Sequence, residues 1–244
     1  METVKAVGKI QMKAKKICVV IPAFNEEESL PSVITLINKL NYFNQHVVVV
    51  NDGSIDETGR IAKELKVTVI NHNKNMGIGA ALLSGIKYAK ANGFDYVVEL
   101  DADGQHNPKD IKRLLSELKT NDVVIGSRFI KKTNYKTTFF RKYAIYFIRN
   151  LIRVCTGKVI YDPTSGFRAY NKKVILYLSS GGNFDSIEPV SLVKILNYNF
   201  KLKELSVYMK KRQAGKSSMT PIRSFCLFWV IVLMIIYYAF KTKD

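Results

Sequence analysis

The sequence predicts an α/β protein with a mainly parallel sheet flanked by helices and a hydrophobic helix near the C-terminus. Short apolar, β-branched runs alternate with stretches of helical spacing between residues 17 and 130. The chain has 244 residues and is 47% apolar, which is enough to bury a substantial core. Residues 225–240 form an uninterrupted run without charge. These three observations exclude a disordered or fibrous chain.

The expected strands and helices follow one another regularly in the first half of the chain. The strands are expected at residues 17–21, 46–51, 67–70, 95–100 and 122–126. Between them, apolar residues keep helical spacing at 30–40, 78–89 and 111–118. The main polar clusters each follow a strand, at 25–28, 51–56, 71–79 and 101–106. Because the carboxyl ends of parallel strands share one edge, we expect these clusters to meet there, where ligands bind.

The pattern changes after residue 130. Residues 134–156 predict a helix with a broad aromatic and aliphatic side and a basic stripe of Lys142, Arg149 and Arg153. This composition is typical of a helix in a membrane interface, and a core helix with a solvated stripe is the alternative. Residues 161–208 are expected to return to the sheet with another helix, and 209–220 to form a basic loop.

The last apolar run is predicted to contact a membrane. Its sixteen residues, 225–240, would span about 24 Å as a helix, against a hydrocarbon core of about 30 Å. Both a crossing and an in-plane position therefore stay open.

Charge is distributed unevenly along this chain of formal net charge +18. Residues 131–244 hold 21 Lys and Arg against 5 Asp and Glu, whereas residues 1–130 hold 17 against 15. The second half thus suits a polyanion or an anionic membrane, and a solvated lysine-rich surface is the alternative. The three cysteines, Cys18, Cys155 and Cys226, lack metal or redox spacing, which fits a reducing compartment. The apolar run 17–21 is too short for a signal peptide, so we expect a cytoplasmic catalytic part.

Asp101 and Asp103 follow an apolar strand and are one residue apart. Side chains at i and i+2 of an extended chain point to the same side, and two converging carboxylates are costly unless a cation lies between them. Oxygen ligands with open positions suit Mg²⁺ or Mn²⁺ bridging phosphates. Alone, however, this D-x-D pattern is equally compatible with a turn and helix N-cap before Pro108.

Further motifs occur with the D-x-D segment in a fixed order. They are VVIPAFNEE at 19–27, VVVNDGSID at 48–56, NMGIGAA at 75–81 and DADGQH at 101–106. This series resembles glycosyltransferase family 2, and within it the polyprenyl-phosphate sugar synthases of the dolichyl-phosphate mannose synthase type. IGSR at 125–128 and DPTSGFRA at 162–169 support the narrower resemblance, which covers about residues 17–218.

The resemblance implies a GT-A fold and an enzyme that uses Mg²⁺ or Mn²⁺. It would transfer a sugar from a nucleotide-sugar donor to a polyprenyl (undecaprenyl or dolichyl) phosphate at the cytoplasmic membrane face, with inversion. The chain then divides into a basic segment (1–16), a catalytic domain (17–218) and a membrane-associating helix and tail (219–244). The expected partners are the donor, the lipid and the membrane, with no nucleic acid, and with a small membrane protein or a second copy as a further alternative.

Site residues are carried over from the family at matching positions. The nucleotide pocket would be lined by Pro22, Phe24, Glu26, Val50 and Asp52, the last contacting the base. The metal and diphosphate would be held by Asp101, Asp103 and Gln105, with Ala102 beside the donor. Donor or acceptor phosphates would meet Arg128, Arg212 and Lys216, and the acceptor would meet Ser165 and Arg168. The alternative, purely structural roles are a helix cap for Asp52 and surface ion pairs for Arg128 and Arg168.

Two positions depart from the family pattern. The lysine often found six residues after the position of Arg212 is Ser218 here, with Lys216 two residues earlier, and the first carboxylate of the common D-D-G-S run is Asn51. The substitution at Ser218 weakens any inference about donor identity.

The acceptor decides whether a general base is needed. A lipid phosphate is already anionic, so positioning and charge neutralisation suffice. A sugar hydroxyl would need a carboxylate base, for which Glu188 is the best candidate and Asp185 the next. The catalytic residues are then Asp103, Arg128 and Glu188.

Three rival functions are open at this point. The first is a glycosyltransferase of the same fold that extends a lipid-linked or surface polysaccharide at a sugar hydroxyl. The second is a nicotinamide-binding protein, suggested by Gly77-Ile78-Gly79, although Leu82 stands where the fingerprint needs a small residue. The third is a non-catalytic membrane or nucleic-acid binder that uses only the basic surface.

Overall fold

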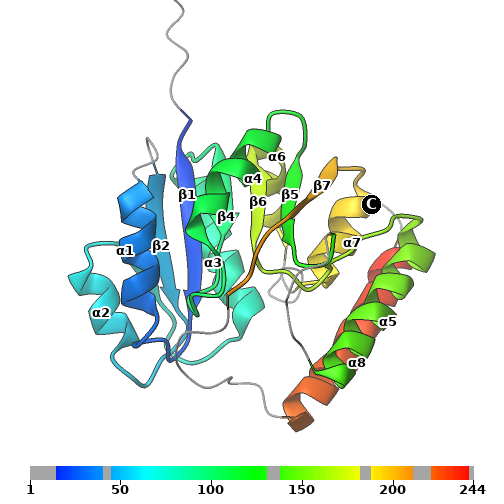
Figure 1. Cartoon of the computed structure of the whole chain (residues 1–244), viewed down its shortest axis with the longest axis horizontal. Coiled ribbons are helices and arrows are strands. Elements are labelled where there is room, and N and C mark those ends of the chain that lie inside the picture. The colour runs from blue at the N-terminus through cyan, green and yellow to red at the C-terminus, as the bar shows by residue number, and fades with distance from the viewer. Residues whose placement is uncertain (1–14, 41–44, 131–137, 182–187, 211–220, 242–244) are drawn as a thin grey trace, which may run out of the picture.

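The computed structural model describes residues 15–40, 45–130, 138–181, 188–210 and 221–241, with side chains from 225 in the last range. Its centre is a seven-stranded sheet in the order β3-β2-β1-β4-β6-β5-β7 (Figure 1). The strands are β1 (Ile17–Ala23), β2 (Gln45–Asn51), β3 (Thr68–Asn71), β4 (Tyr96–Glu99), β5 (Val123–Ser127), β6 (Arg168–Asn171) and β7 (Leu202–Ser206).

Most strand pairs in this sheet are parallel. β1 pairs in parallel with β2 and β4, β2 with β3, and β5 with β7. β6 runs antiparallel to both of its neighbours, β4 and β5. The predicted fold class is therefore confirmed, and the return to the sheet expected within 161–208 consists of β6 and β7.

Helices cover both faces of the sheet because the strands alternate their side chains. Val19 and Ile21 of β1 share one apolar cluster with α1 (Leu30–Leu40) and α4 (Ile111–Glu117). Cys18 and Val20 point the other way and share a second cluster with the helices of the opposite face. Those helices are α3 (Ile78–Ala91), α6 (Lys172–Leu178) and α7 (Val190–Asn197). The short α2 (Thr58–Glu64) and the 3-10 turn η1 (Pro108–Asp110) complete the N-terminal part.

Two long helices lie side by side next to the β7 edge of the sheet, α5 (Phe139–Thr156) and α8 (Pro221–Phe240) (Figure 1). Ile148 and Ile152 of α5 join Ile231 and Ile235 of α8 in the second cluster. α5 ends at Gly157, whose φ of 69° is a left-handed C-cap that glycine adopts without strain.

The sequence located most elements to within a few residues. The five expected strands and the helices at 30–40, 78–89 and 111–118 are confirmed, as is a helix within 134–156, described from residue 139. α2 was not predicted. Residues 211–220 of the expected basic loop lie outside the described residues. Among the residues that are described, no helix is both long and apolar enough to cross a membrane.

Candidate functional site

The sheet has its topological switch point between β1 and β4. From β1 the chain proceeds outward through β2 to β3, whereas β4 lies on the other side of β1. In open α/β sheets the ligand crevice forms outside the carboxyl ends of two such strands. The loop after β1 carries the end of the motif 19–27, and the loop after β4 carries the motif 101–106, so the predicted motifs meet where a ligand site is expected.

Hydrogen bonds tie the loop after β1 to the loop after β2. The backbone N–H of Asn25 donates to Ser54 Oγ over 3.1 Å, and the N–H of Ile55 donates to Asn25 Oδ1 over 3.0 Å. Asn25 has a φ of 55°, a left-handed conformation that asparagine tolerates. Pro22, Phe24 and Glu26 are half-buried along this edge. They remain predicted donor contacts.

Two predicted pocket residues lie deeper than the family pattern suggests. Val50 has no exposed surface and belongs to the apolar cluster under α3, and its predicted donor contact stays a prediction. Asp52 is only 3% exposed. Its carboxylate accepts the N–H groups of Met76 over 3.0 Å and of Gly77 over 2.8 Å, at the start of α3.

The same contacts argue against a nicotinamide site. A dinucleotide's diphosphate binds the free N–H groups at such a glycine turn. Here the chain's own Asp52 carboxylate accepts the N–H groups of Met76 and Gly77. The Gly77-Ile78-Gly79 turn is therefore an internal anion site filled by an aspartate.

Asp101 and Asp103 stand at the end of β4 and are half-buried, with 31% of the Asp101 side chain exposed. Asp103 Oδ1 accepts the N–H of Gln105 over 3.0 Å, which folds the turn around Gly104. The backbone of Gly166 approaches Asp101 closely: a Cβ there would lie 2.9 Å from Asp101 Oδ1. The two carboxylates are thus held at the edge by the chain on both sides.

His106 orients Asp101. The N–H of Asp101 donates to His106 Nδ1 over 3.3 Å, and His106 Nε2 lies 3.7 Å from Asp101 Oδ2. Burial lowers the pKa of His106 to about 4, although the negative charge of Asp103 acts to raise it. The imidazole is therefore neutral at pH 7. Because Nδ1 accepts a hydrogen bond, the ring hydrogen is on Nε2, which faces Asp101.

A buried polar network lies behind the D-x-D turn. Tyr170 donates its hydroxyl to Glu99 Oε2 over 2.9 Å. Burial raises the pKa of Glu99 to about 8, and the charge of Glu188 adds to the rise. Burial also raises the pKa of Glu188. The charge of Arg168 opposes this rise, and the charge of Asp101 adds to it. The Oε1 atom of Glu188 is buried without a hydrogen-bond partner among the described residues.

Arg128 forms a buried ion pair with Asp162, and the pair joins the ends of two motifs. The Arg128 Nε and Nη2 atoms donate to the Asp162 carboxylate over 2.7 Å and 2.6 Å, and Nη2 also donates to Thr164 over 2.8 Å. Arg128 is 3% exposed and Asp162 is fully buried. The charge of Arg128 is thus matched inside the protein, and its predicted contact with a phosphate stays a prediction.

The two predicted acceptor residues are also buried. Ser165 donates to the carbonyl of Gly126 over 2.6 Å. Arg168 donates to the carbonyls of Ser165 and Pro163 and to Ser191 Oγ, over 2.7, 3.0 and 2.8 Å. Both residues are at most 2% exposed, so in this structure they shape the 162–168 turn from inside.

The structure brings together some predicted residues and leaves others undescribed. The half-buried residues at the edge are Pro22, Phe24, Glu26, Asp101, Asp103 and Gln105. Ala102 is buried in the core. Arg212, Lys216, Ser218 and Asp185 lie outside the described residues. Sequence reasoning missed His72, Glu99 and Tyr170; a carboxylate inside the apolar strand YVVEL was the available signal for Glu99.

The D-x-D turn offers a partial set of metal ligands. In the part of the chain that the structure describes, no group of three or more His, Cys, Asp and Glu side chains could hold a metal ion. The two carboxylates at the edge are hard oxygen donors, the type that Mg²⁺ and Mn²⁺ prefer, and they suit an ion that takes its other ligands from substrate and water. The residues present therefore fit such an ion.

Comparison with known proteins gives consistent relatives. Residues 18–177 match the model of the family "Glycosyl transferase family 2". The polyprenol monophosphomannose synthase of Mycolicibacterium smegmatis is 32% identical over 83% of this chain and 80% of its own length. The undecaprenyl-phosphate mannosyltransferase of Micrococcus luteus is 30% identical over 84% of this chain and 88% of its own length. A UDP-N-acetylglucosamine–dolichyl-phosphate N-acetylglucosaminyltransferase of Methanococcus voltae is 34% identical over 69% of this chain and 74% of its own length.

Solved structures agree with the fold. Glucosyl-3-phosphoglycerate synthase from Mycobacterium tuberculosis, crystallised with Mn²⁺ and UDP-glucose, superposes with a TM-score of 0.71. It is 19% identical, and the match covers 95% of this chain and 81% of that one. The expected GT-A fold is thereby confirmed. Together, the ordered motifs at the switch point, the match over 18–177 and the relatives above 30% identity lead to one conclusion: this chain is a glycosyltransferase and belongs to glycosyltransferase family 2.

Proposed function

We propose that this enzyme transfers a sugar from a nucleotide-sugar donor to a polyprenyl phosphate at the cytoplasmic face of the membrane, with inversion and with Mg²⁺ or Mn²⁺. The observation that carries the proposal is the pair of half-buried carboxylates, Asp101 and Asp103, at the switch point of the sheet. The names of the relatives support the acceptor, because three of them act on polyprenol, undecaprenyl phosphate or dolichyl phosphate.

Asp101 and Asp103 would hold the metal ion, with Gln105 beside them. The Mn²⁺ and UDP-glucose bound to the structural neighbour support this choice of cofactor and donor class. When bound, such an ion neutralises the negative charge that develops on a departing nucleoside diphosphate. The neutral His106 holds Asp101 without adding a positive charge that would compete with the ion.

A lipid phosphate would attack without a general base. Its oxygen is anionic near neutral pH, so the protein has to position it and exclude water from the anomeric carbon. The basic second half of the chain supports an anionic acceptor. Arg168 in this half, like Arg128 just before it, is committed to internal partners. The predicted phosphate contacts of Arg212 and Lys216 remain part of the proposal.

Membrane contact is proposed through the outer face of α5 and α8. Large apolar side chains stand exposed along both helices, at Phe139, Phe140, Tyr143, Tyr146, Phe147, Phe225, Trp229, Leu233, Tyr237 and Phe240. The exposed cations Arg141, Lys142 and Arg153 lie on α5, and neither helix contains an acidic residue. An apolar surface that carries only positive charge suits an anionic bilayer.

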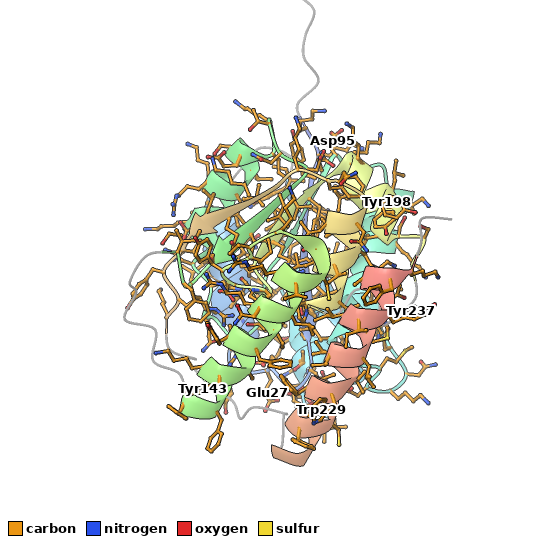
Figure 2. The ribbon with its side chains drawn as sticks, turned by 90° about the vertical axis from the view of Figure 1, so that its right-hand side faces the viewer. Glu27, Asp95, Tyr143, Tyr198, Trp229 and Tyr237 are labelled. Atoms are coloured by element: carbon orange, nitrogen blue, oxygen red, sulfur yellow. The ribbon has the colours of Figure 1, made fainter. Side chains whose placement is uncertain are left out.

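The position of this aromatic surface supports a lipid acceptor. Figure 2 shows Tyr143 and Trp229 at the same end of the molecule as Glu27, which belongs to the loop after β1, whereas Asp95 lies at the opposite end. The parts of α5 and α8 that carry Tyr143 and Trp229 therefore lie toward the same end as the ligand edge. A membrane that contacts them would lie next to the proposed site.

The test is a screen of nucleotide sugars with undecaprenyl or dolichyl phosphate and Mg²⁺ or Mn²⁺, followed by extraction of the lipid product. We expect label from one donor to appear on the polyprenyl phosphate only when metal is present. Label that appears only on a longer glycan would contradict the lipid-phosphate acceptor.

One observation favours a second candidate, transfer to a sugar hydroxyl. Glu188 has a raised pKa and a buried carboxylate oxygen that finds no hydrogen-bond partner among the described residues, which are features of a general base. Replacing it, as Glu188→Gln, separates the two candidates. Near-complete loss of transfer with donor binding intact would favour the hydroxyl acceptor, whereas retained transfer supports the base-free reaction.

A further inference from the structure

The turn 162–168 lies between α5 and β6, and its first residue is held from two sides. The backbone N–H of Asp162 donates to Glu204 Oε1 over 2.9 Å, and the N–H of Tyr161 donates to Glu204 Oε2 over 2.7 Å. On the other side, the Asp162 carboxylate accepts the backbone N–H of Arg128 over 2.9 Å, in addition to the guanidinium bonds described above. Asp162 is therefore fixed both by its backbone and by its side chain.

The two groups that hold Asp162 come from neighbouring strands. Glu204 lies in β7 and pairs with Ile125 of β5, and Arg128 directly follows β5. The Glu204 carboxylate offers two accepting oxygens, so it binds two consecutive N–H groups at once. Hydrogen bonds to an ionised acceptor are also stronger than those between neutral groups. The sheet thus sets the position at which the turn begins.

The other end of the turn lies against the D-x-D segment. A Cβ on Gly166 would lie 2.9 Å and 3.2 Å from the two carboxylate oxygens of Asp101. The next residue, Phe167, is fully buried and stacks on His106, with ring centroids 5.0 Å apart and an interplanar angle of 17°. Because Gly166 has no side chain, the turn backbone can approach the carboxylate this closely.

We propose that Glu204 and Gly166 are positioning residues for the metal ion. Glu204 fixes the turn 162–168 at Asp162, and Gly166 leaves the Asp101 carboxylate the room to take the orientation in which it binds the ion. The inference rests on the proposed function, because it takes Asp101 as a metal ligand. Outer groups that orient a metal ligand typically change the metal affinity about 10- to 100-fold when they are replaced.

Gly166→Ala tests the contact with Asp101 directly. The backbone of Gly166 is not left-handed, so alanine fits its conformation, and the added methyl group displaces only the movable end of the Asp101 side chain. The probes are UDP and GDP, whose affinities are measured by titration calorimetry without metal and over a range of Mn²⁺ concentrations. We expect the Mn²⁺ concentration that gives half of the metal-dependent gain in affinity to rise about tenfold. The affinity without metal and the melting temperature should stay close to wild type.

Glu204→Ala and Glu204→Gln test the hold on the turn in the full-length protein. We expect Glu204→Ala to raise the required Mn²⁺ concentration about tenfold, and Glu204→Gln to raise it less, because one oxygen still accepts an N–H group. The matched control is Asp122→Ala. Asp122 accepts the N–H of Lys201 over 2.8 Å and the side-chain amide of Asn171 over 2.7 Å, at the amino ends of the same strands β5 and β7. Its loss should leave the Mn²⁺ dependence unchanged even where it lowers the melting temperature as much.

Hydrogen exchange of the metal-free protein gives a readout that needs neither nucleotide nor metal. Amides of residues 101–106 should exchange several-fold faster in Glu204→Ala than in wild type, because the turn that supports this segment is released. In Asp122→Ala the same amides should exchange at the wild-type rate. Mass spectrometry of peptides that cover this segment measures the difference.

The opposite results are distinguishable. Gly166→Ala with the wild-type Mn²⁺ dependence would overturn the inference, and so would unchanged exchange at 101–106 in Glu204→Ala. An equal shift of the Mn²⁺ dependence in Asp122→Ala would reduce the effect to general destabilisation and would overturn it too. If wild-type protein gains no nucleotide affinity from Mn²⁺, the metal site of the proposed function is wrong and the inference falls with it. Faster exchange in Glu204→Ala would then show that the failure lies in the function and not in the contact between the turn and 101–106.

Discussion

Glu99 is a carboxyl group inside a strand whose neighbours Val97 and Val98 are fully buried. Burial and the charge of Glu188 raise its pKa from 4.5 to about 8, so the folded protein keeps its proton at neutral pH. Below pH 4.5 Glu99 is protonated in both the folded and the unfolded protein. Between pH 4.5 and 8 the unfolded chain releases the proton and the folded chain retains it, so this group makes the protein less stable as pH rises.

Glu99→Gln is therefore expected to stabilise the protein at pH 8.5 and to change little at pH 4.5. Glutamine cannot ionise and still accepts the Tyr170 hydroxyl, and each pKa unit corresponds to about 1.4 kcal/mol, giving a gain of a few kcal/mol. Urea unfolding at the two pH values measures the difference. A gain that does not depend on pH would contradict a protonated Glu99.

The Arg128–Asp162 pair gives a second prediction at residue scale. Asp162→Asn leaves the Arg128 guanidinium buried without its counter-charge, so the free energy of unfolding should fall by about 3–5 kcal/mol. The double variant Arg128→Met, Asp162→Asn should lose clearly less than the sum of the single changes. Urea unfolding of the three variants measures this coupling, and strict additivity would show that the pair is not a buried unit.

At the scale of elements, α3 packs against β1 through Gly85. A Cβ at Gly85 would lie 2.2 Å from Cγ1 of Val20. Alanine in place of glycine inside a helix usually adds about 1 kcal/mol of stability. Here we expect Gly85→Ala to destabilise the protein by about 1–3 kcal/mol, because the added methyl group overpacks the contact.

Thermal and urea unfolding of Gly85→Ala check this contact. Shortening the partner, as Val20→Ala in the same chain, should cost less than it does in the wild-type background, because it makes room for the methyl group. A more stable Gly85→Ala would mean that α3 lies farther from the sheet than the structure has it.

The sequence predicted elements wherever apolar periodicity was strong. β1 to β5 and α1, α3 and α4 carry such patterns, and their strand-end clusters placed Asp101 and Asp103 at the edge. α2 was missed because only Thr58 and Ala62 of its seven residues are buried. β6 was not predicted as a separate strand because its sequence, Arg-Ala-Tyr-Asn, has no apolar alternation. Arg168 is buried with hydrogen-bond partners at 163, 165 and 191.

The same limit applies to the site. The burial of Arg128 depends on Asp162, 34 residues away, and the burial of Asp52 depends on His72, 20 residues away. No local pattern reports these pairings, so the sequence could not show that these side chains have internal partners. Asp101 and Asp103 were located correctly because their position depends only on the end of one strand.

At the scale of the whole molecule, one surface joins the basic charge to the exposed aromatic side chains of α5 and α8. Replacing Phe140 and Trp229 by Ser should weaken binding to phosphatidylcholine vesicles that contain phosphatidylglycerol by at least about tenfold, because each buries an apolar ring in the bilayer. Val154→Ser is the matched control: Val154 is 84% exposed and Phe140 is 85% exposed, but Val154 lies about 20 Å farther along α5.

Cosedimentation with vesicles measures this binding. The paired substitutions should leave donor binding intact while Val154→Ser changes vesicle binding much less. Equal effects at both ends of α5, or none at either, would contradict a membrane contact beside the ligand edge.

The most direct test of the central claim is metal-dependent sugar transfer to polyprenyl phosphate by wild type, Asp103→Asn and Asp95→Asn. Asp95 lies at the opposite end of the molecule from the ligand edge, so its variant controls for loss of a surface carboxylate. We predict that Asp103→Asn loses at least about 100-fold in transfer across a Mn²⁺ titration, whereas Asp95→Asn retains wild-type activity. Transfer by Asp103→Asn at the wild-type rate and with the wild-type metal dependence would contradict the account.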